Sequence, residues 1–133
     1  MKKIMAFGTF DIFHEGHKSY LEQAKKLGEY LIVVVARDKT VTYIKKQETR
    51  NKEQIRLKNL KDTKIADEVV LGGLEDKYVV IEKYRPDVIA IGYDQKVDLD
   101  ELTEKLGNLK LKAEIVRLKS YEPEKFKSSK LRK

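Results

Sequence analysis

The sequence predicts an α/β fold, a Rossmann-like three-layer sandwich built on a five-stranded parallel sheet with the strand order 3-2-1-4-5. Five short apolar runs lie along the chain, and segments with helical spacing of apolar residues lie between them. The first run, the helical segment after it and the second run make one βαβ unit, and the alternation continues to the end. Because parallel crossovers return over a face in the right-handed sense, helices are expected on both faces of the sheet.

The apolar runs and stop signals set the expected boundaries. Strands are predicted at residues 2–7, 30–36, 68–71, 87–91 and 113–118. The first helix carries apolar residues at helical spacing and stops before Gly28; these residues are Tyr20, Leu21, Ala24 and Leu27. Further helices are predicted at residues 51–60, 77–84 and 99–106. In the first of these three the inward residues are expected to be Ile55, Leu57 and Leu60, and the other two are ended by Pro86 and Gly107.

Length and cysteine content bound the class of protein. A chain of 133 residues is expected to form one domain, residues 1–133. The absence of cysteine excludes disulfides and thiolate zinc sites. Without a long apolar run at the amino terminus, we expect a cytoplasmic protein. The longest apolar run, residues 30–36, is too short to cross a bilayer.

The charge is basic, with 29 Lys and Arg against 22 Asp and Glu. Much of the surplus lies in residues 117–133. Such a surplus favours an anionic partner, which by charge alone is a nucleic acid, an anionic membrane or a phosphorylated small molecule. Residues 37–50 form a connection long enough to be a lid or binding loop.

Both histidines of the chain lie in the segment GTFDIFHEGH, from Gly8 to His17. This segment leaves the first strand and enters the first helix, where open α/β sheets bind ligands and where helix amides attract phosphate. Gly8 is expected to allow a sharp turn, and Gly16 a close approach just before the helix. Two imidazoles three residues apart at the helix mouth can point the same way and donate hydrogen bonds to phosphate, so the segment is predicted to bind an anion.

Two other interpretations apply to these histidines. A single histidine near a strand end is usually structural, which is the better interpretation of His14 taken alone. A zinc site would need a third histidine or a cysteine, and the HExxH spacing is absent.

The segment G-T-F-D-x-x-H-x-G-H resembles the signature of the cytidylyltransferase-like nucleotidyltransferases. Further similarities lie in order along the chain: Arg37–Asp38, Lys45–Lys46, the EQIR stretch at residues 53–56, Asp67–Glu68 and IGYD at residues 91–94. Within this superfamily, IVVVARDKTV, IGYDQ, Tyr121 and Ser128–Ser129 look most like archaeal-type FAD synthetase. The opening is also similar to glycerol-3-phosphate cytidylyltransferase and to the adenylyltransferase domain that makes ADP-heptose for lipopolysaccharide core.

The chain departs from these families in two respects. The cytidylyltransferase run RTEGISTT is replaced by KSYEPEKFKSS at residues 119–129, which counts against CTP as donor. The archaeal-type FAD synthetases often carry cysteines near the carboxyl terminus, and this chain has none.

The resemblance implies transfer of AMP from ATP to a phosphorylated acceptor, most favourably FMN, with release of pyrophosphate and with Mg²⁺ accompanying ATP. It also implies a homodimer. No protein cluster is expected to hold a metal. The implied catalytic residues are His14, His17 and Lys46, the last with its neighbour Lys45. The implied nucleotide-binding residues are Gly8, Thr9, Phe10, His14, Glu15, Gly16, His17, Gly92, Asp94, Tyr121, Ser128 and Ser129, and the candidate acceptor-binding residues are Asp11 and Arg56.

Structural roles remain open for several of these residues. Lys45 and Lys46 can belong to a solvated loop, Gly92 and Asp94 to a turn, and the two serines to a helix cap. Asp11 can cap the turn, and Arg56 can pair with Glu53 instead of binding phosphate.

Two other classes of function remain open. One is a nucleic-acid-binding module that uses the basic residues of 117–133, although that segment has only Tyr121 and Phe126 as aromatic residues. The other is a nucleotide-binding regulator without catalysis.

Overall fold

Five parallel strands form one sheet in the order β3-β2-β1-β4-β5, which confirms the predicted fold class and strand order. The computed structural model describes residues 1–11, 13–39, 51–73, 78–93, 95 and 97–119. The strands are β1 (Lys3–Gly8), β2 (Tyr30–Val35), β3 (Glu68–Leu71), β4 (Val88–Ile91) and β5 (Glu114–Arg117). Because the four pairings are parallel, the carboxyl ends of the strands lie along one edge of the sheet.

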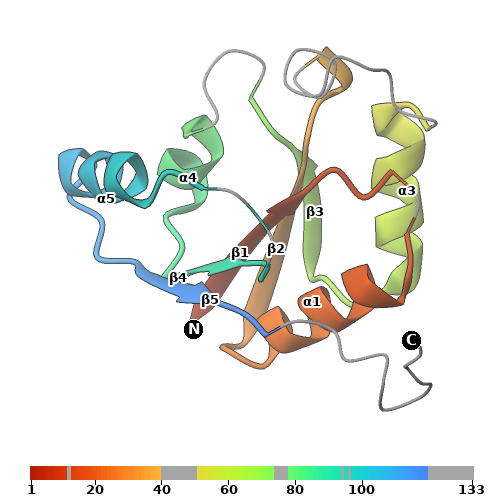
Figure 1. The fold of residues 1–133 in the computed structure, drawn as a ribbon, viewed down its shortest axis with the longest axis horizontal. Helices are drawn as coiled ribbons and strands as arrows, with labels where there is room; N and C mark the ends of the chain where they lie inside the picture. Colours follow the sequence, from red (N-terminus) through yellow and green to blue (C-terminus); the bar gives the residue numbers. More distant parts are fainter. Residues whose placement is uncertain (12, 40–50, 74–77, 94, 96, 120–133) are drawn as a thin grey trace, which may run out of the picture.

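Helices cover both faces of this sheet. They are α1 (Glu15–Lys25), α3 (Glu53–Thr63), α4 (Val79–Tyr84) and α5 (Leu99–Asn108). Figure 1 shows α1 and α3 on one side of the strands and α4 and α5 on the other. The result is the predicted three-layer arrangement. In the part of the chain that the structure describes, no helix is long and apolar enough to span a membrane.

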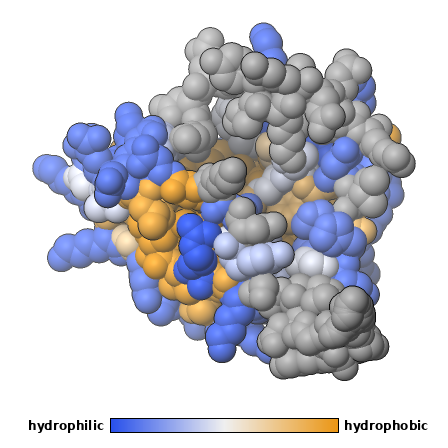
Figure 2. Space-filling view, viewed as in Figure 1, coloured by the Kyte–Doolittle hydropathy of each residue, from blue (hydrophilic) through white to orange (hydrophobic). Residues whose placement is uncertain are grey.

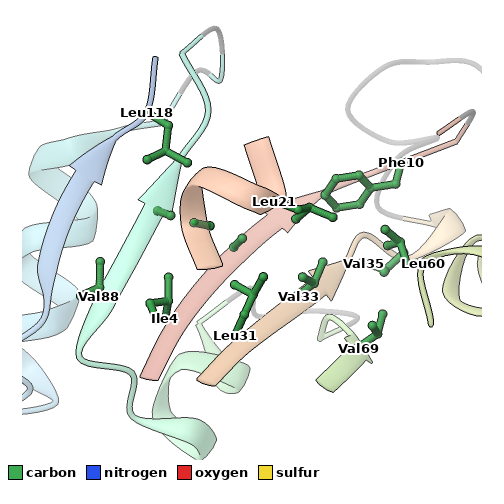
Figure 3. Close-up of a cluster of buried hydrophobic side chains, with 13 residues drawn as sticks. Ile4, Phe10, Leu21, Leu31, Val33, Val35, Leu60, Val69, Val88 and Leu118 are labelled. Carbon is green, nitrogen blue, oxygen red and sulfur yellow. The ribbon is translucent and has the colours of Figure 1, made fainter. Parts of the chain in front are cut away.

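Alternate residues of the strands supply two separate cores, as strands buried on both faces require. In β1, Ile4 packs in a cluster with Leu21 of α1 and Leu60 of α3. Its neighbour Met5 packs in a second cluster with residues of α4 and α5, among them Leu102. Figure 3 shows the first cluster, with side chains from four strands gathered beside Leu21 and Leu60. The sheet is therefore held from both sides.

The helix boundaries differ from expectation at several positions. The predicted helix at residues 51–60 begins at Glu53 and runs to Thr63, and Asn51 lies before it. The helix expected to close at Gly107 continues to Asn108. The left-handed residue that follows it is Lys110, with φ of 56°. A glycine is thus not needed to end α5.

The inward face of α3 was wrongly predicted at one position. Ile55 is 51% exposed, whereas Arg56 is completely buried, Leu60 is 1% exposed and Leu57 is partly buried against the core. Residues 56 and 60 are four apart and share one helix face, while residue 55 lies about 100° away from 56. A charged residue therefore takes the inward position that the apolar pattern assigned to Ile55.

The surface also carries apolar side chains near one end of the sheet. Val97 and Leu99, before and at the start of α5, are 38% and 44% exposed. Figure 2 shows a hydrophobic area left of centre, in the part of the view that α4, α5, β4 and β5 occupy in Figure 1. An apolar surface thus lies beside the connection from β4 to α5.

The burial of Leu60 and the exposure of Ile55 on α3 predict different effects on stability when each is replaced. Leu60→Ala should lower the free energy of unfolding by about 2–5 kcal/mol, because it leaves a cavity in the core. Ile55→Ala, the matched control on the same helix, should change it by no more than about 0.5 kcal/mol. Urea unfolding followed by circular dichroism measures both. A larger loss for Ile55→Ala than for Leu60→Ala would contradict this orientation of α3.

Candidate active site

The signature loop, which we define as residues Gly8–His17, joins the carboxyl end of β1 to the first turn of α1. It lies at the edge of the sheet where β1 and β4 are neighbours but their onward connections run to opposite faces. This is the switch point at which open α/β sheets bind ligands. The predicted anion-binding segment therefore occupies the expected place in the fold.

His14 and His17 hydrogen-bond reciprocally to backbone amides at the start of α1. The Gly16 N–H donates to Nδ1 of His14 at 3.0 Å, and the His14 N–H donates to Nδ1 of His17 at 3.3 Å. His14 is the N-cap residue, and the two contacts form a capping box in which imidazoles replace the usual serine and glutamate. Two amides of the signature loop are satisfied in this way.

These contacts decide which ring nitrogens can donate. A neutral imidazole has one N–H and one acceptor nitrogen. Because both Nδ1 atoms accept hydrogen bonds, we assign the proton of each neutral ring to Nε2, on the far side of the ring from the backbone amides. The ring centroids are 3.8 Å apart and the ring planes differ by 22°. Two neighbouring Nε2–H donors therefore stand at the positive end of the α1 dipole, which favours an anionic ligand.

Aromatic side chains fix the ring of His17 further. Phe10 meets it edge-on, with centroids 5.2 Å apart, and Phe13 lies against it at 5.7 Å. Phe10 is only 4% exposed and packs in the core with Leu21, whereas His14 and Glu15 are exposed. The phenylalanines of the signature loop thus hold the His17 ring against the core.

Steric contacts account for both glycines of the loop. A Cβ on Gly8 would lie 2.6 Å from the Phe10 ring, and a Cβ on Gly16 would lie 2.9 Å from the His14 ring. The sharp turn expected at Gly8 is made instead by Phe10, whose φ is 53°. Gly16 is the second residue of α1 and does not precede it. Both glycines therefore make room for the rings that shape the loop.

Two side chains bridge the carboxyl ends of β1 and β4. These strands pair as far as Ala6 and Ala90. Beyond that point, the Tyr20 hydroxyl donates to Ala90 O at 2.8 Å and accepts from the Phe7 N–H at 3.1 Å. Burial raises the pKa of Tyr20 far above its usual value, so the hydroxyl keeps the proton that it donates. Sequence analysis gave Tyr20 only as one of the residues at helical spacing in the first helix.

The second bridge is Gln95, in the turn after β4. Its Nε2 donates to Phe7 O at 2.7 Å, and its Oε1 accepts from the Gly92 N–H at 2.8 Å. From β5, Nη1 of Arg117 donates to Gly92 O at 2.9 Å and to Gln95 O at 3.0 Å. The turn that carries Gly92 is therefore attached to both β1 and β5. Asp94 of this turn lies outside the described residues.

Arg56 is fully buried and touches three separate segments. Its Nη1 donates to Thr9 O at 2.8 Å, its Nε to Asn51 O at 3.1 Å, and its Nη2 to Asp38 Oδ1 at 2.7 Å. The pairing with Glu53 that the sequence left open is wrong, because the ion pair is made with Asp38. The guanidinium is directed at the underside of the signature loop and not at solvent.

Asp11 is also held from below the loop. The backbone N–H of Asn51 donates to Asp11 Oδ1 at 2.8 Å, and Nδ2 of Asn51 donates to Asp11 O at 2.7 Å. These contacts agree with the turn-holding role that the sequence left open for Asp11. Sequence analysis gave Asn51 no role beyond starting a helix.

Asp38 and Glu53, which lie on either side of residues 40–50 in the sequence, hydrogen-bond each other reciprocally. The Asp38 N–H donates to the Glu53 carboxylate at 2.8 Å, and the Glu53 N–H donates to the Asp38 carboxylate at 3.1 Å. The bond from the Asp38 amide, with the ion pair to Arg37, lowers the pKa of Glu53. Arg37–Asp38 and the EQIR stretch at residues 53–56, two of the segments that resemble the family, therefore contact each other in the structure.

Several predicted site residues fall outside the described part of the chain: Lys45, Lys46, Asp94, Tyr121, Ser128 and Ser129. Within the described part, no group of three or more His, Asp or Glu side chains is placed to hold a metal ion.

The comparisons with known proteins agree with this geometry. Residues 5–133 match the cytidylyltransferase-like family. The protein belongs to that family. Among relatives of this cytidylyltransferase-like protein, the FAD synthase of Ferroglobus placidus is 48% identical over 122 residues, which cover 92% of this chain and 79% of that protein. The FAD synthase of Thermoplasma volcanium is 41% identical over 133 residues, covering 100% of this chain and 93% of its own.

A solved structure supports the fold. The lipopolysaccharide core biosynthesis protein of Thermoplasma volcanium superposes with a TM-score of 0.86 at 39% identity, over 92% of this chain and 99% of its own. With the family match and the FAD synthase relatives, this cytidylyltransferase-like protein is a nucleotidyltransferase.

The assigned ring protons give a paired test on each histidine. His17→Asn keeps an acceptor at the Nδ1 position but loses the Nε2–H, so nucleotidyl transfer should fall by at least roughly a hundredfold while stability is kept. His17→Gln places an N–H near Nε2 but removes the Nδ1 acceptor, so the free energy of unfolding should fall by about 1 kcal/mol with a smaller loss of rate. His14→Asn and His14→Gln should show the same two effects.

Pyrophosphate release and thermal melting measure the two effects. An Asn variant of either histidine that turns over like the wild type would contradict the donor role of Nε2.

Proposed function

We propose that the protein transfers AMP from ATP to FMN and so forms FAD and pyrophosphate. The observation that carries the proposal is the pair of imidazoles of His14 and His17 at the amino terminus of α1, whose Nδ1 atoms both accept backbone hydrogen bonds and so leave Nε2 as the donor of each neutral ring. Hydrogen-bond donors fixed before the substrate arrives stabilise the charge that develops as the phosphoanhydride bond between the α- and β-phosphates breaks. The nucleotidyltransferase family membership agrees with this chemistry.

The reaction depends on positioning the two substrates and on stabilising negative charge more than on proton transfer. A phosphate oxygen of the acceptor attacks the α-phosphorus of ATP, and the bond from that phosphorus to the bridging oxygen breaks. Pyrophosphate leaves with the electron pair. The imidazole donors contact the α-phosphate and the leaving oxygen, and the backbone amides of Thr9 and Phe10 contact other phosphate oxygens. The first turn of α1, which contains Glu15, Gly16 and His17, adds its dipole.

Three features favour ATP and FMN over the alternatives. Relatives named FAD synthase are 40–48% identical to this chain, and the RTEGISTT run of the cytidylyltransferases is missing. Tyr93 follows β4 at the site edge and is 55% exposed. It lies in the same connection as the exposed Val97, so a flat isoalloxazine ring has an aromatic and apolar surface to bind.

A second candidate acceptor is heptose 1-phosphate. It is favoured by one observation, the name of the Thermoplasma volcanium structure, which refers to lipopolysaccharide core biosynthesis. A sugar phosphate has no aromatic ring, so the exposed Tyr93 favours FMN.

Further parts of the proposal concern the cation, the assembly and the site residues outside the described part of the chain. Mg²⁺ would be held by the triphosphate oxygens and water, as it often is when few protein ligands are present, and it would neutralise phosphate charge. Lys46, Asp94, Tyr121, Ser128 and Ser129 remain proposed contacts of ATP. A cytoplasmic homodimer is also proposed, on the family resemblance.

An acceptor screen tests the proposal directly. The protein is incubated with Mg²⁺ and either ATP or CTP, with FMN, glycerol 3-phosphate and heptose 1-phosphate offered in turn, and the products are separated by chromatography. FAD formed from ATP and FMN is the expected result. ADP-heptose or CDP-glycerol as the main product would contradict the choice of FMN while leaving the family assignment intact.

Lys46→Ala tests the proposed contact from the long connection. We expect a rise in KM for ATP of roughly tenfold or more and little change in melting temperature, since the lost contact is with substrate phosphates. Lys58→Ala is a matched control, because Lys58 is an exposed lysine whose partner is Asp62 on the same helix. A variant that melts early yet keeps its KM for ATP would assign Lys46 a structural role instead.

A further inference from the structure

Arg56 is the one charged side chain that is completely buried in the described part of the chain. Burying a guanidinium is costly unless its N–H groups are all directed at acceptors, and removing one partner of such a group is costly too. None of the three acceptors lies on α3 itself. They are Thr9 O in the signature loop, Asn51 O two residues before α3 begins, and Asp38 Oδ1 in the segment after β2. The buried guanidinium therefore joins the signature loop, the chain just before α3 and the segment after β2, and breaking any of these hydrogen bonds would leave a buried N–H group without its acceptor.

The contact with Thr9 fixes the orientation of one peptide group. Nη1 of Arg56 holds Thr9 O at 2.8 Å, and Thr9 and Phe10 share a planar trans peptide. In such a peptide the N–H points opposite to the C=O. With Thr9 O directed at the buried guanidinium, the Phe10 N–H points away from it, and that amide is one of the two proposed phosphate donors.

The orientation needs support, because Phe10 has a φ of 53°. For a residue with a side chain this left-handed conformation is energetically unfavourable, because Cβ approaches the following carbonyl oxygen. The second arm of the network acts on the other side of Phe10. Nε of Arg56 binds Asn51 O, and Asn51 in turn binds both the carbonyl and the carboxylate of Asp11. The loop is therefore held at residue 9 and at residue 11.

We propose that Arg56 is a positioning residue for nucleotidyl transfer, which holds the Thr9–Phe10 peptide so that its N–H faces the triphosphate, and that it does not bind the acceptor. The proposal rests on the proposed function only for the identity of the acceptor. It assigns Arg56 an effect on ATP and a negligible effect on FMN. Asn51 shares the role through Asp11.

The test uses Arg56→Lys, which keeps the charge but replaces the guanidinium fork by a single ammonium group. The affinity for α,β-methylene-ATP is measured by calorimetry, and kcat and both KM values are measured for ATP and FMN. We expect a loss of affinity for the analogue of about tenfold, a comparable fall in kcat, and a KM for FMN within about twofold of the wild type. Lys58→Met on the outer face of α3 is the control and should match the wild type.

Asn51→Ala keeps the test decisive if Arg56→Lys does not fold. This variant removes only the side-chain bond to Asp11 O, and we expect it to weaken analogue binding by roughly threefold or more. Unchanged affinity in Asn51→Ala, or in a folded Arg56→Lys protein with a lowered melting temperature, would make the network merely structural and overturn the proposal. A rise confined to the KM for FMN would overturn it in favour of acceptor binding.

Analogue binding does not require FMN to be the acceptor. If the wild type makes no FAD, the proposed function fails, and the affinity for the analogue still decides the role of Arg56.

Discussion

The geometry of the candidate active site depends on the reciprocal hydrogen bonds between two imidazoles and two backbone amides at the start of α1. A helix begins with amides that have no partner within the helix, and here histidines supply the acceptors. These two hydrogen bonds therefore have two effects: they cap the start of the helix, and they leave Nε2 as the donor nitrogen of each ring. In the proposed reaction the imidazole donors are fixed by the same bonds that stabilise the fold, so little reorganisation is needed for them to meet a phosphate.

The candidate site lies at the carboxyl ends of β1 and β4, and side chains from distant parts of the chain hold the backbone there. Beyond Ala6 and Ala90 the strands β1 and β4 no longer pair, and their backbone groups are bound by Tyr20 and Gln95. Below the signature loop, Arg56 and Asn51 bind its carbonyl groups. The loop thus rests on side chains from α1, α3 and the β4 connection, which explains how it keeps a left-handed phenylalanine.

The strand order, the helical layers and the place of the signature loop could be predicted from the sequence, because they follow from periodicity and from chain connectivity. The burial of Arg56 could not. An apolar pattern assigns Ile55 to the core, and only the contact with Thr9, 47 residues away, shows why an arginine lies inside. Gln95 is similar, since its partner Phe7 is 88 residues away. The left-handed turn at Phe10 likewise has no local signal, because glycine at position 8 was the better candidate for it.

The protonation of the two histidines tests the account most directly. With ¹⁵N-labelled protein in mildly alkaline buffer, long-range ¹H–¹⁵N correlation spectra distinguish the two neutral tautomers of each imidazole. We predict that both rings carry the proton on Nε2 before any nucleotide is added, and that the same tautomers persist when α,β-methylene-ATP binds. A proton on Nδ1 of His14 or His17, or a mixture of tautomers in the free protein, would contradict the account.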